Sequence, residues 1–246
     1  MCPLSKERME HLMNLYVKNC VCCTLVVFLL TFVVCVMPSA AQETAFRYET
    51  NIADYEKATA EKPLPEHCTM FVGSSTWRLW GSQLEKDFAE FNAVNRGFGG
   101  ATILDVLYVM HRIITPYKPE RIVFFCGGND IAEGASSEKT LENFKTFLSR
   151  LRAESPQTKE VFFVSVTASP SREKFREQTL QYNALVRELA EKTDGLYYID
   201  TLATLLGEDG KADEKYFLED RLHLNREGQE RWIPVITAAV GQYSVR

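Results

Sequence analysis

Short apolar runs alternate with longer amphipathic stretches along the sequence from Cys68 onward. The runs are rich in Val, Ile, Phe and Tyr, and nearly every position in them is apolar, which is typical of parallel strands buried on both faces. They predict five strands, at residues 69–72, 91–94, 121–126, 161–166 and 196–199. Five strands make a complete small sheet.

Between the predicted strands, apolar residues recur at the i, i+3, i+4, i+7 spacing of a helix face. These stripes consist of Ile103, Val106, Leu107 and Met110, of Phe144, Phe147, Leu148 and Leu151, and of Tyr182, Leu185, Val186 and Leu189. Ser169 and Pro170 are predicted to be the N-cap and the first-turn proline of the third helix. The alternation predicts one α/β domain at residues 68–246, a three-layer α/β/α sandwich around a five-stranded parallel sheet with right-handed crossovers.

The N-terminal segment has a different pattern. Residues 19–41 contain no charged side chain, Lys18 precedes them, and the small residues of a cleavage site stand at 39–41. Residues 1–41 are therefore predicted to be a signal peptide, which implies export to the periplasm or the cell exterior. The apolar run is also close to the length of a membrane span, so an uncleaved signal anchor is the alternative. Residues 42–67 are predicted to be a lead-in segment with a short helix at 52–61.

Amino-acid composition and net charge exclude some classes of protein and some classes of partner. The 246 residues are 46% hydrophobic and 25% charged, which fits a globular chain and excludes a disordered one. The net charge is −5 and no cluster of Lys and Arg is present, so nucleic acid is not expected as a partner. Of the seven cysteines, only Cys68 and Cys126 lie beyond residue 41.

Candidate chemistry lies after the predicted strands, because ligands of open parallel sheets bind at the carboxyl ends of the strands. The segments that follow the first three strands are residues 73–76, 95–100 and 127–130. Ser75 stands where a strand gives way to a helix, so its hydroxyl can face the crevice while its N–H faces developing negative charge. A serine in this place could instead be only an N-cap.

A nucleophilic serine needs a base, and three histidines lie beyond residue 41. His67 precedes the first strand, at the wrong end of the sheet, and His111 lies within a helix, so both are interpreted as structural or surface groups. His223 follows Asp220 by three residues, close enough for the carboxylate to hold the tautomer whose Nε2 faces a serine. The alternative interpretation is a turn aspartate and a surface histidine.

Donors for a developing oxyanion are also present. Gly97, Gly99 and Gly100 let a backbone N–H approach a substrate oxygen, although turn formation alone would explain them too. Asn129 offers an uncharged amide donor, and its alternative role is to hold loops together. The sequence contains no dinucleotide-binding fingerprint, no P-loop and no G-x-S-x-G elbow.

Taken together, these residues resemble the SGNH hydrolases, also called GDSL-like lipases and esterases. The resemblance extends from about Cys68 to the C-terminal helix. The family's first motif appears as residues 73–75, its second within 95–102, its Gly-x-Asn-Asp motif as 127–130 and its Asp-x-x-His motif as 220–223. The resemblance implies the same sandwich, with a flavodoxin-like strand order.

The resemblance also implies roles for individual residues. Ser75 would be the nucleophile, His223 the base and Asp220 the partner that orients the base. The backbone N–H of Gly100 and the side chain of Asn129 would join the Ser75 N–H in the oxyanion hole. No cofactor and no metal are implied.

Ser74 replaces the family's usual Asp, which puts the geometry of its loop in question more than the catalytic set. Pro234 falls inside the expected last helix and is expected to kink it or to set its boundary. The resemblance places Cys68 and Cys126 near opposite ends of the sheet, farther apart than the roughly 7 Å that a disulfide spans, so two free thiols are expected.

The expected activity is hydrolysis of a carboxylic ester through an acyl-enzyme, with a small-molecule or carbohydrate substrate carrying acetyl or another short acyl group. Trp77, Trp80 and the loop at 168–172 are candidates for shaping the pocket. A lysophospholipase or thioesterase and a non-catalytic sugar- or lipid-binding protein are the alternatives on the same scaffold. A metal-dependent phosphoesterase would use Asp130 with Asp220 and His223, but further ligands at suitable spacing are lacking. A membrane partner is expected only through an uncleaved N-terminal anchor.

Overall fold

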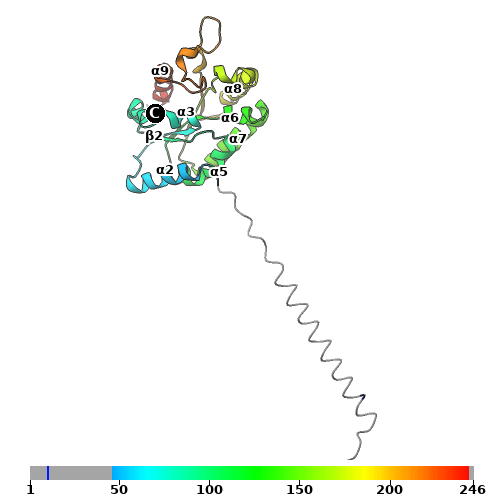
Figure 1. The fold of residues 1–246 in the computed structure, drawn as a ribbon. Helices are drawn as coiled ribbons and strands as arrows, with labels where there is room; N and C mark the ends of the chain where they lie inside the picture. The colour runs from blue at the N-terminus through cyan, green and yellow to red at the C-terminus, as the bar shows by residue number, and fades with distance from the viewer. Residues whose placement is uncertain (1–9, 11–45, 244–246) are drawn as a thin grey trace, which may run out of the picture. The chain divides into compact units, whose positions relative to one another are not determined.

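The computed structural model describes Glu10 and residues 46–243 of the chain. The predicted signal segment at residues 1–41 thus lies outside the described residues, apart from Glu10. The chain from Tyr48 onward forms one compact unit (Figure 1). In the part of the chain described, no helix has the length and apolar character needed to cross a membrane.

A five-stranded sheet forms the centre of this unit. Its strands are β1 (Thr69–Gly73), β2 (Ala93–Gly97), β3 (Arg121–Phe125), β4 (Glu160–Val164) and β5 (Leu196–Ile199). All neighbouring strands are parallel, and their order is β2-β1-β3-β4-β5. This confirms the predicted sheet and its flavodoxin-like order. Because the chain leaves β1 first toward β2 and later returns to β3 on the other side, a ligand crevice is expected beside the carboxyl ends of β1 and β3.

Helices fill both faces of the sheet. They are α2 (Glu49–Glu61), α3 (Ser75–Trp80), α4 (Gln83–Asp87), α5 (Ile103–Ile113), α6 (Gly128–Ala132), α7 (Ser137–Glu154), α8 (Arg176–Glu191) and α9 (Arg226–Tyr243). Short 3₁₀ segments stand at residues 89–91, 115–117, 170–175, 202–205 and 214–216. The three helices predicted from apolar stripes correspond to α5, α7 and α8.

Tryptophans of α3 and α9 cover one face of the sheet. The ring of Trp77 in α3 lies 5.2 Å from the ring of Phe71 in β1. The ring of Trp232 in α9 lies 5.4 Å from that of Phe125 in β3. All four side chains belong to one buried cluster, and burying a ring of this size contributes on the order of 2–3 kcal/mol. This layer holds α3, which carries Ser75, firmly against the sheet.

The opposite face packs against α5, α7 and α8, of which the last two lie side by side in Figure 1. Phe124 of β3 contacts Phe144 and Phe147 of α7, with ring centres 5.1 and 4.5 Å apart. Phe163 of β4 contacts Tyr182 of α8 at 5.6 Å. Strand residues therefore alternate between two aromatic layers, which is why their runs are apolar throughout.

Polar contacts attach the lead-in helix α2 to this domain. The Tyr55 hydroxyl donates to the carbonyl of Gly97 in β2. Arg112 of α5 forms ion pairs with Glu49 and Glu56, at N–O distances of 2.7 and 2.6 Å. The short helix predicted at 52–61 thus corresponds to α2, and its side chains reach the edge strand of the sheet.

The second predicted strand was misplaced by its sequence pattern. Residues 91–94 were expected to be extended, but Phe91 ends a 3₁₀ turn and Asn92 has a left-handed φ of 50°. β2 runs from Ala93 to Gly97 instead, so Asn95 and Arg96 belong to the strand and not to the loop after it. Edge strands tolerate polar residues, and the Asn95 amide donates to the carbonyl of Trp77 at 2.7 Å.

The predicted start of the third helix at Ser169 and Pro170 was also wrong. Ser169 and Pro170 begin the 3₁₀ segment at 170–175, and α8 begins only at Arg176. The Ser169 side chain makes no capping hydrogen bond. Of the two effects expected of Pro234, it does not set a boundary, since α9 extends past it to Tyr243 with Pro234 on the exposed side of the helix. The expected kink stays a prediction. The third and fourth predicted strands, 121–126 and 161–166, end one and two residues earlier than expected.

Candidate active site

The turn from β1 into α3 positions Ser75. Gly73 has a φ of +141°, and a Cβ at this position would lie 2.0 Å from the carbonyl oxygen of Phe125. Only glycine therefore allows β1 and β3 to approach this closely at their ends. The Ser74 N–H donates to the same oxygen at 3.1 Å, so the backbone holds this turn without the aspartate usual in place of Ser74. Ser75 is the first residue of α3, where N–H groups lack acceptors within the helix.

His223 and Asp220 lie beside Ser75, although they are far from it in the sequence. The Nε2 atom of His223 lies 2.7 Å from the Ser75 Oγ. Its Nδ1 atom lies 2.6 Å from Oδ2 of Asp220. The loop is closed by an antiparallel bridge between Phe217 and Leu224. The structure thus brings together the three residues that the sequence had placed in a nucleophile–base–carboxylate chain.

The Asp220 carboxylate is held in its charged form. Partial burial raises its pKa, but the hydrogen bond from the His223 side chain and those from the backbone N–H groups of His223 and Leu222 outweigh that effect, and the pKa falls to about 2. The two backbone bonds to Oδ1 measure 3.0 and 2.9 Å. A permanently ionised carboxylate at Nδ1 favours the tautomer that leaves Nε2 free to accept the serine proton.

Asn129 lies at the start of α6, and two hydrogen bonds fix the orientation of its side chain. Its Nδ2 donates to the carbonyl of Ala101 at 2.9 Å, and its Oδ1 accepts from Nη2 of Arg172 at 2.6 Å. An amide nitrogen carries two hydrogens, so one N–H remains for a substrate oxygen. The bond from Arg172 was not foreseen, because the two residues are 43 positions apart and no local pattern links them.

Gly100 does not line the hollow beside Ser75. It is exposed and has a φ of +77°. The loop that carries it is anchored on its other side. Both carboxylate oxygens of Asp130 lie 3.1–3.2 Å from the N–H of Ile103, the first residue of α5. Gly97 ends β2, and Gly99 and Gly100 form the turn after it.

Comparison with known proteins shows the family. Residues 63–231 match the GDSL-like lipase/acylhydrolase family. The chain belongs to this family. It is therefore a serine hydrolase that acts on ester bonds, and the resemblance to SGNH hydrolases in its sequence is confirmed. A search of curated protein sequences found no match.

Solved structures share the fold of this acylhydrolase. A Bacteroides fragilis protein assigned to the acylhydrolases has 22% identity and a TM-score of 0.68, covering 78% of this chain and 96% of its own. A GDSL-like lipase from Bacteroides thetaiotaomicron has 21% identity and a TM-score of 0.66, with 78% and 98% coverage. An acetyl xylan esterase has 20% identity and a TM-score of 0.58, with 70% and 98% coverage. At such identities the likeness establishes the fold alone.

A small hollow opens between the catalytic candidates of the acylhydrolase. Its volume is about 30 Å³, and Ser75, His223, Asn129, Ser169 and Arg172 are among its lining residues. That volume accommodates about two water molecules. Ser169 and Arg172 line the hollow, which confirms the predicted contribution of the 168–172 loop at these two positions. The two tryptophans suggested beside it lie in the hydrophobic core instead.

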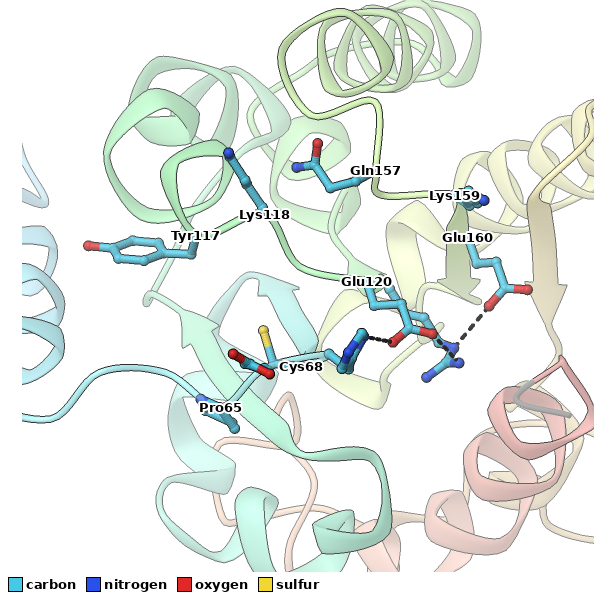
Figure 2. A pocket seen from close by; sticks show the side chains of 11 residues that line it. Pro65, Cys68, Tyr117, Lys118, Glu120, Gln157, Lys159 and Glu160 are labelled. Carbon is cyan, nitrogen blue, oxygen red and sulfur yellow. Dashed lines mark hydrogen bonds and ion pairs between the residues drawn. The ribbon is translucent and has the colours of Figure 1, made fainter. Parts of the chain in front are cut away.

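A larger hollow, of about 700 Å³, lies at the opposite ends of the strands (Figure 2). His67 lies there, as expected, with its Nδ1 atom 3.1 Å from Glu120. Arg121 bridges Glu120 and Glu160 at 2.6 and 2.9 Å. The volume of a hollow therefore does not identify the candidate active site, because neither Ser75 nor His223 lines this larger hollow.

The residues of the phosphoesterase alternative are not gathered at one point. Asp130 faces the N terminus of α5, whereas Asp220 and His223 face Ser75. Among residues 46–243, no three His, Cys, Asp or Glu side chains are placed to hold one metal ion. Cys68 and Cys126 are buried free thiols.

We expect Asn129→Ala to lower kcat for an acetate ester by about 10²–10³-fold, because one oxyanion donor is lost. KM should change little, since the donor acts on charge that develops in the transition state. Steady-state kinetics of both proteins measure the effect. Asn92→Ala, in the left-handed turn before β2, is the matched control. An equal loss of kcat in that variant would contradict a role of Asn129 in catalysis.

Asp130 should make stability depend on pH. Burial raises its pKa from the ordinary 3.8 to about 6, although the hydrogen bond from the Ile103 N–H opposes this. Between these values the folded protein binds a proton that the unfolded chain does not, so the free energy of unfolding falls as pH rises from about 4 to about 6, by up to about 1.4 kcal/mol per pH unit. Asp130→Asn should flatten this slope. Urea unfolding at several pH values tests it, and an unchanged slope in the variant would refute the assignment.

Proposed function

We propose that this acylhydrolase is an exported serine esterase that hydrolyses carboxylic esters through an acyl-enzyme on Ser75. One observation carries the proposal, namely the unbroken chain of hydrogen-bond contacts from Ser75 Oγ through both ring nitrogens of His223 to Asp220. A serine, a base and a carboxylate at these distances form the arrangement that activates a hydroxyl for acyl transfer.

In the proposed mechanism, the Ser75 Oγ attacks the ester carbonyl while His223 Nε2 takes its proton. The remaining Asn129 N–H and the N–H of Ser75 donate to the oxyanion. The resemblance adds the N–H of Gly100, whose turn would have to approach the hollow when substrate binds, because Gly100 does not line it. Collapse of this intermediate expels the alcohol, which receives the proton from His223. Water then repeats the sequence on the acyl-enzyme, releases the acid and restores Ser75. Asp220 keeps its negative charge throughout and stabilises the imidazolium.

The proposed substrate carries a short acyl group such as acetyl, on a carbohydrate or another small alcohol. The volume of the hollow beside Ser75, about 30 Å³, supports a short acyl group over a long one. Two of the proteins with a similar fold are an acetyl xylan esterase and an acetyl-xylooligosaccharide esterase from Geobacillus, which is consistent with this class of substrate. A lysophospholipase or thioesterase would need room for a longer chain.

Export is part of the proposal and rests on the sequence of residues 1–41, with its uncharged apolar run and small residues at 39–41. Cell fractionation followed by N-terminal sequencing tests it. A mature chain that begins near residue 42 outside the cytoplasm is expected. An intact N terminus in the cytoplasmic fraction would refute export, and an intact N terminus in the membrane fraction would show an anchor.

A series of p-nitrophenyl esters from acetyl to decanoyl tests the activity and ranks the acyl groups. Turnover should be highest for acetyl and fall with chain length, and a fluorophosphonate probe should label Ser75. Chelator should leave the rate unchanged. A folded protein with neither turnover nor labelling would favour the non-catalytic binding protein instead, and a maximum at long chains would favour the lipid hydrolase.

A further inference from the structure

We propose that Arg172 and Ser169 form a subsite beside Ser75 that binds an anionic group of the substrate and is separate from the oxyanion hole. The preferred ester therefore carries a carboxylate or phosphate group. This inference rests on the proposed esterase function and names a property of its substrate. Both residues belong to the segment after β4, and both line the same hollow as Ser75 and His223.

The guanidinium of Arg172 has donors to spare. Its Nη2 donates to Oδ1 of Asn129 at 2.6 Å, while an arginine side chain carries five N–H donors in all. A Cβ on Gly128 would lie 3.2 Å from Nη1 of Arg172 and 3.0 Å from Val166. Glycine at this position therefore leaves room for the guanidinium at the edge of the hollow. A planar fork of donors suits a carboxylate or a phosphate.

The charge of Arg172 has no close counterion. Across residues 46–243, no carboxylate lies within 4.0 Å of its side chain, whereas Arg112, Arg121 and Arg226 each contact at least one. Partial burial lowers its pKa, and only the more distant Glu133 acts to raise it. A half-buried cation without a counterion costs free energy that an anionic ligand would recover.

Ser169 provides a second, independent observation. Its side chain is 1% exposed, and in the described part of the chain its Oγ has no hydrogen-bond partner. A buried hydroxyl without a partner is unfavourable and calls for an explanation. Because Ser169 lines the hollow, an oxygen of the ligand could accept from this hydroxyl while it also accepts from Arg172.

The subsite would act on specificity more than on the chemical step. Arg172 is one hydrogen bond away from the Asn129 amide, so an anion bound to it lies next to the position of the reacting carbonyl. The same bond orients Asn129, and removing Arg172 is expected to slow the hydrolysis of neutral esters as well. The ratio of kcat/KM between an anionic and a neutral ester separates recognition of charge from orientation of Asn129.

The test uses the full-length chain and matched esters. With the charge on the alcohol, 4-acetoxybenzoate and 4-acetoxyphenyl phosphate are compared with neutral 4-acetoxybenzamide. With the charge on the acyl group, p-nitrophenyl hemisuccinate is compared with p-nitrophenyl butyrate. In the wild type, kcat/KM should be higher for the anionic member of at least one comparison, by on the order of 10-fold, the size of a charge-assisted hydrogen bond.

Arg172→Gln should abolish this preference, Arg172→Lys should retain part of it, and Ser169→Ala should reduce it. Lys174→Gln removes the same charge from an exposed side chain outside the hollow and should leave the ratio unchanged. The proposal is overturned if the wild type shows no preference in any comparison, or if Arg172→Gln slows neutral and anionic esters equally. Absence of turnover on every ester would instead contradict the esterase function itself.

Discussion

Replacing Ser75 with alanine should lower kcat for an acetate ester by about 10⁶-fold, because it removes the hydroxyl that contacts His223 and that carries the acyl group in the proposed mechanism. The contact between Ser75 Oγ and His223 Nε2 is 2.7 Å long, and in the proposed mechanism both residues act in the same step. KM should stay within a few-fold of the wild type, since the hollow and the oxyanion donors remain. Steady-state kinetics at high enzyme concentration, together with loss of fluorophosphonate labelling, measures this effect.

Ser74→Ala is the matched control, because it removes a neighbouring hydroxyl whose turn is held by the backbone. It should retain most of the activity. The double variant Ser75→Ala/His223→Ala should be no slower than either single variant, since residues that act as a unit are not additive. Ser75→Ala with more than about one hundredth of wild-type kcat would refute the acyl-enzyme on this residue.

Asp220→Asn should lower kcat by about 10⁴-fold, the loss known for the same substitution in the triad of another serine hydrolase. An amide can donate to Nδ1 and so stabilise the wrong tautomer, with the proton on Nε2. The amide also cannot stabilise the imidazolium as a carboxylate does. Rates measured at pH 7 and above test this prediction, with Glu219→Gln as the control that removes a charge from the adjacent exposed residue.

The low pKa of Asp220 makes its contribution to stability depend on pH. Since this pKa is about 2 in the folded protein, against an ordinary value of 3.8, the carboxylate stays charged at every pH at which an esterase is normally assayed. Its contribution to stability is present above about 4 and is lost only as pH falls toward 2. The stability lost in Asp220→Asn should therefore be largest above about pH 4 and should shrink as pH falls toward 2. Urea unfolding of both proteins at several pH values tests this, and a difference that stays equal from pH 7 to pH 3 would contradict the assignment.

Much of the fold follows from local pattern. Strand runs such as 121–126 are apolar throughout because both faces of the sheet are covered, and this pattern survives whatever the neighbouring elements are. β2 was misplaced because an edge strand carries polar residues such as Asn95 and Arg96, and because the left-handed turn at Asn92 leaves no distinct mark. Ser169 and Pro170 have the residue types of an α-helix start, but the chain forms a 3₁₀ turn first.

By itself, the sequence determined the fold class, the family resemblance and the three residues of the Ser75, His223 and Asp220 chain, since each lies in a short motif whose spacing is local. Only the tertiary structure decided what surrounds them. The bonds of Asn129 to Arg172 and to Ala101, and of Asp130 to Ile103, join segments 27 to 43 positions apart. Such contacts depend on how the loops after neighbouring strands converge, and no periodicity along the chain encodes that convergence.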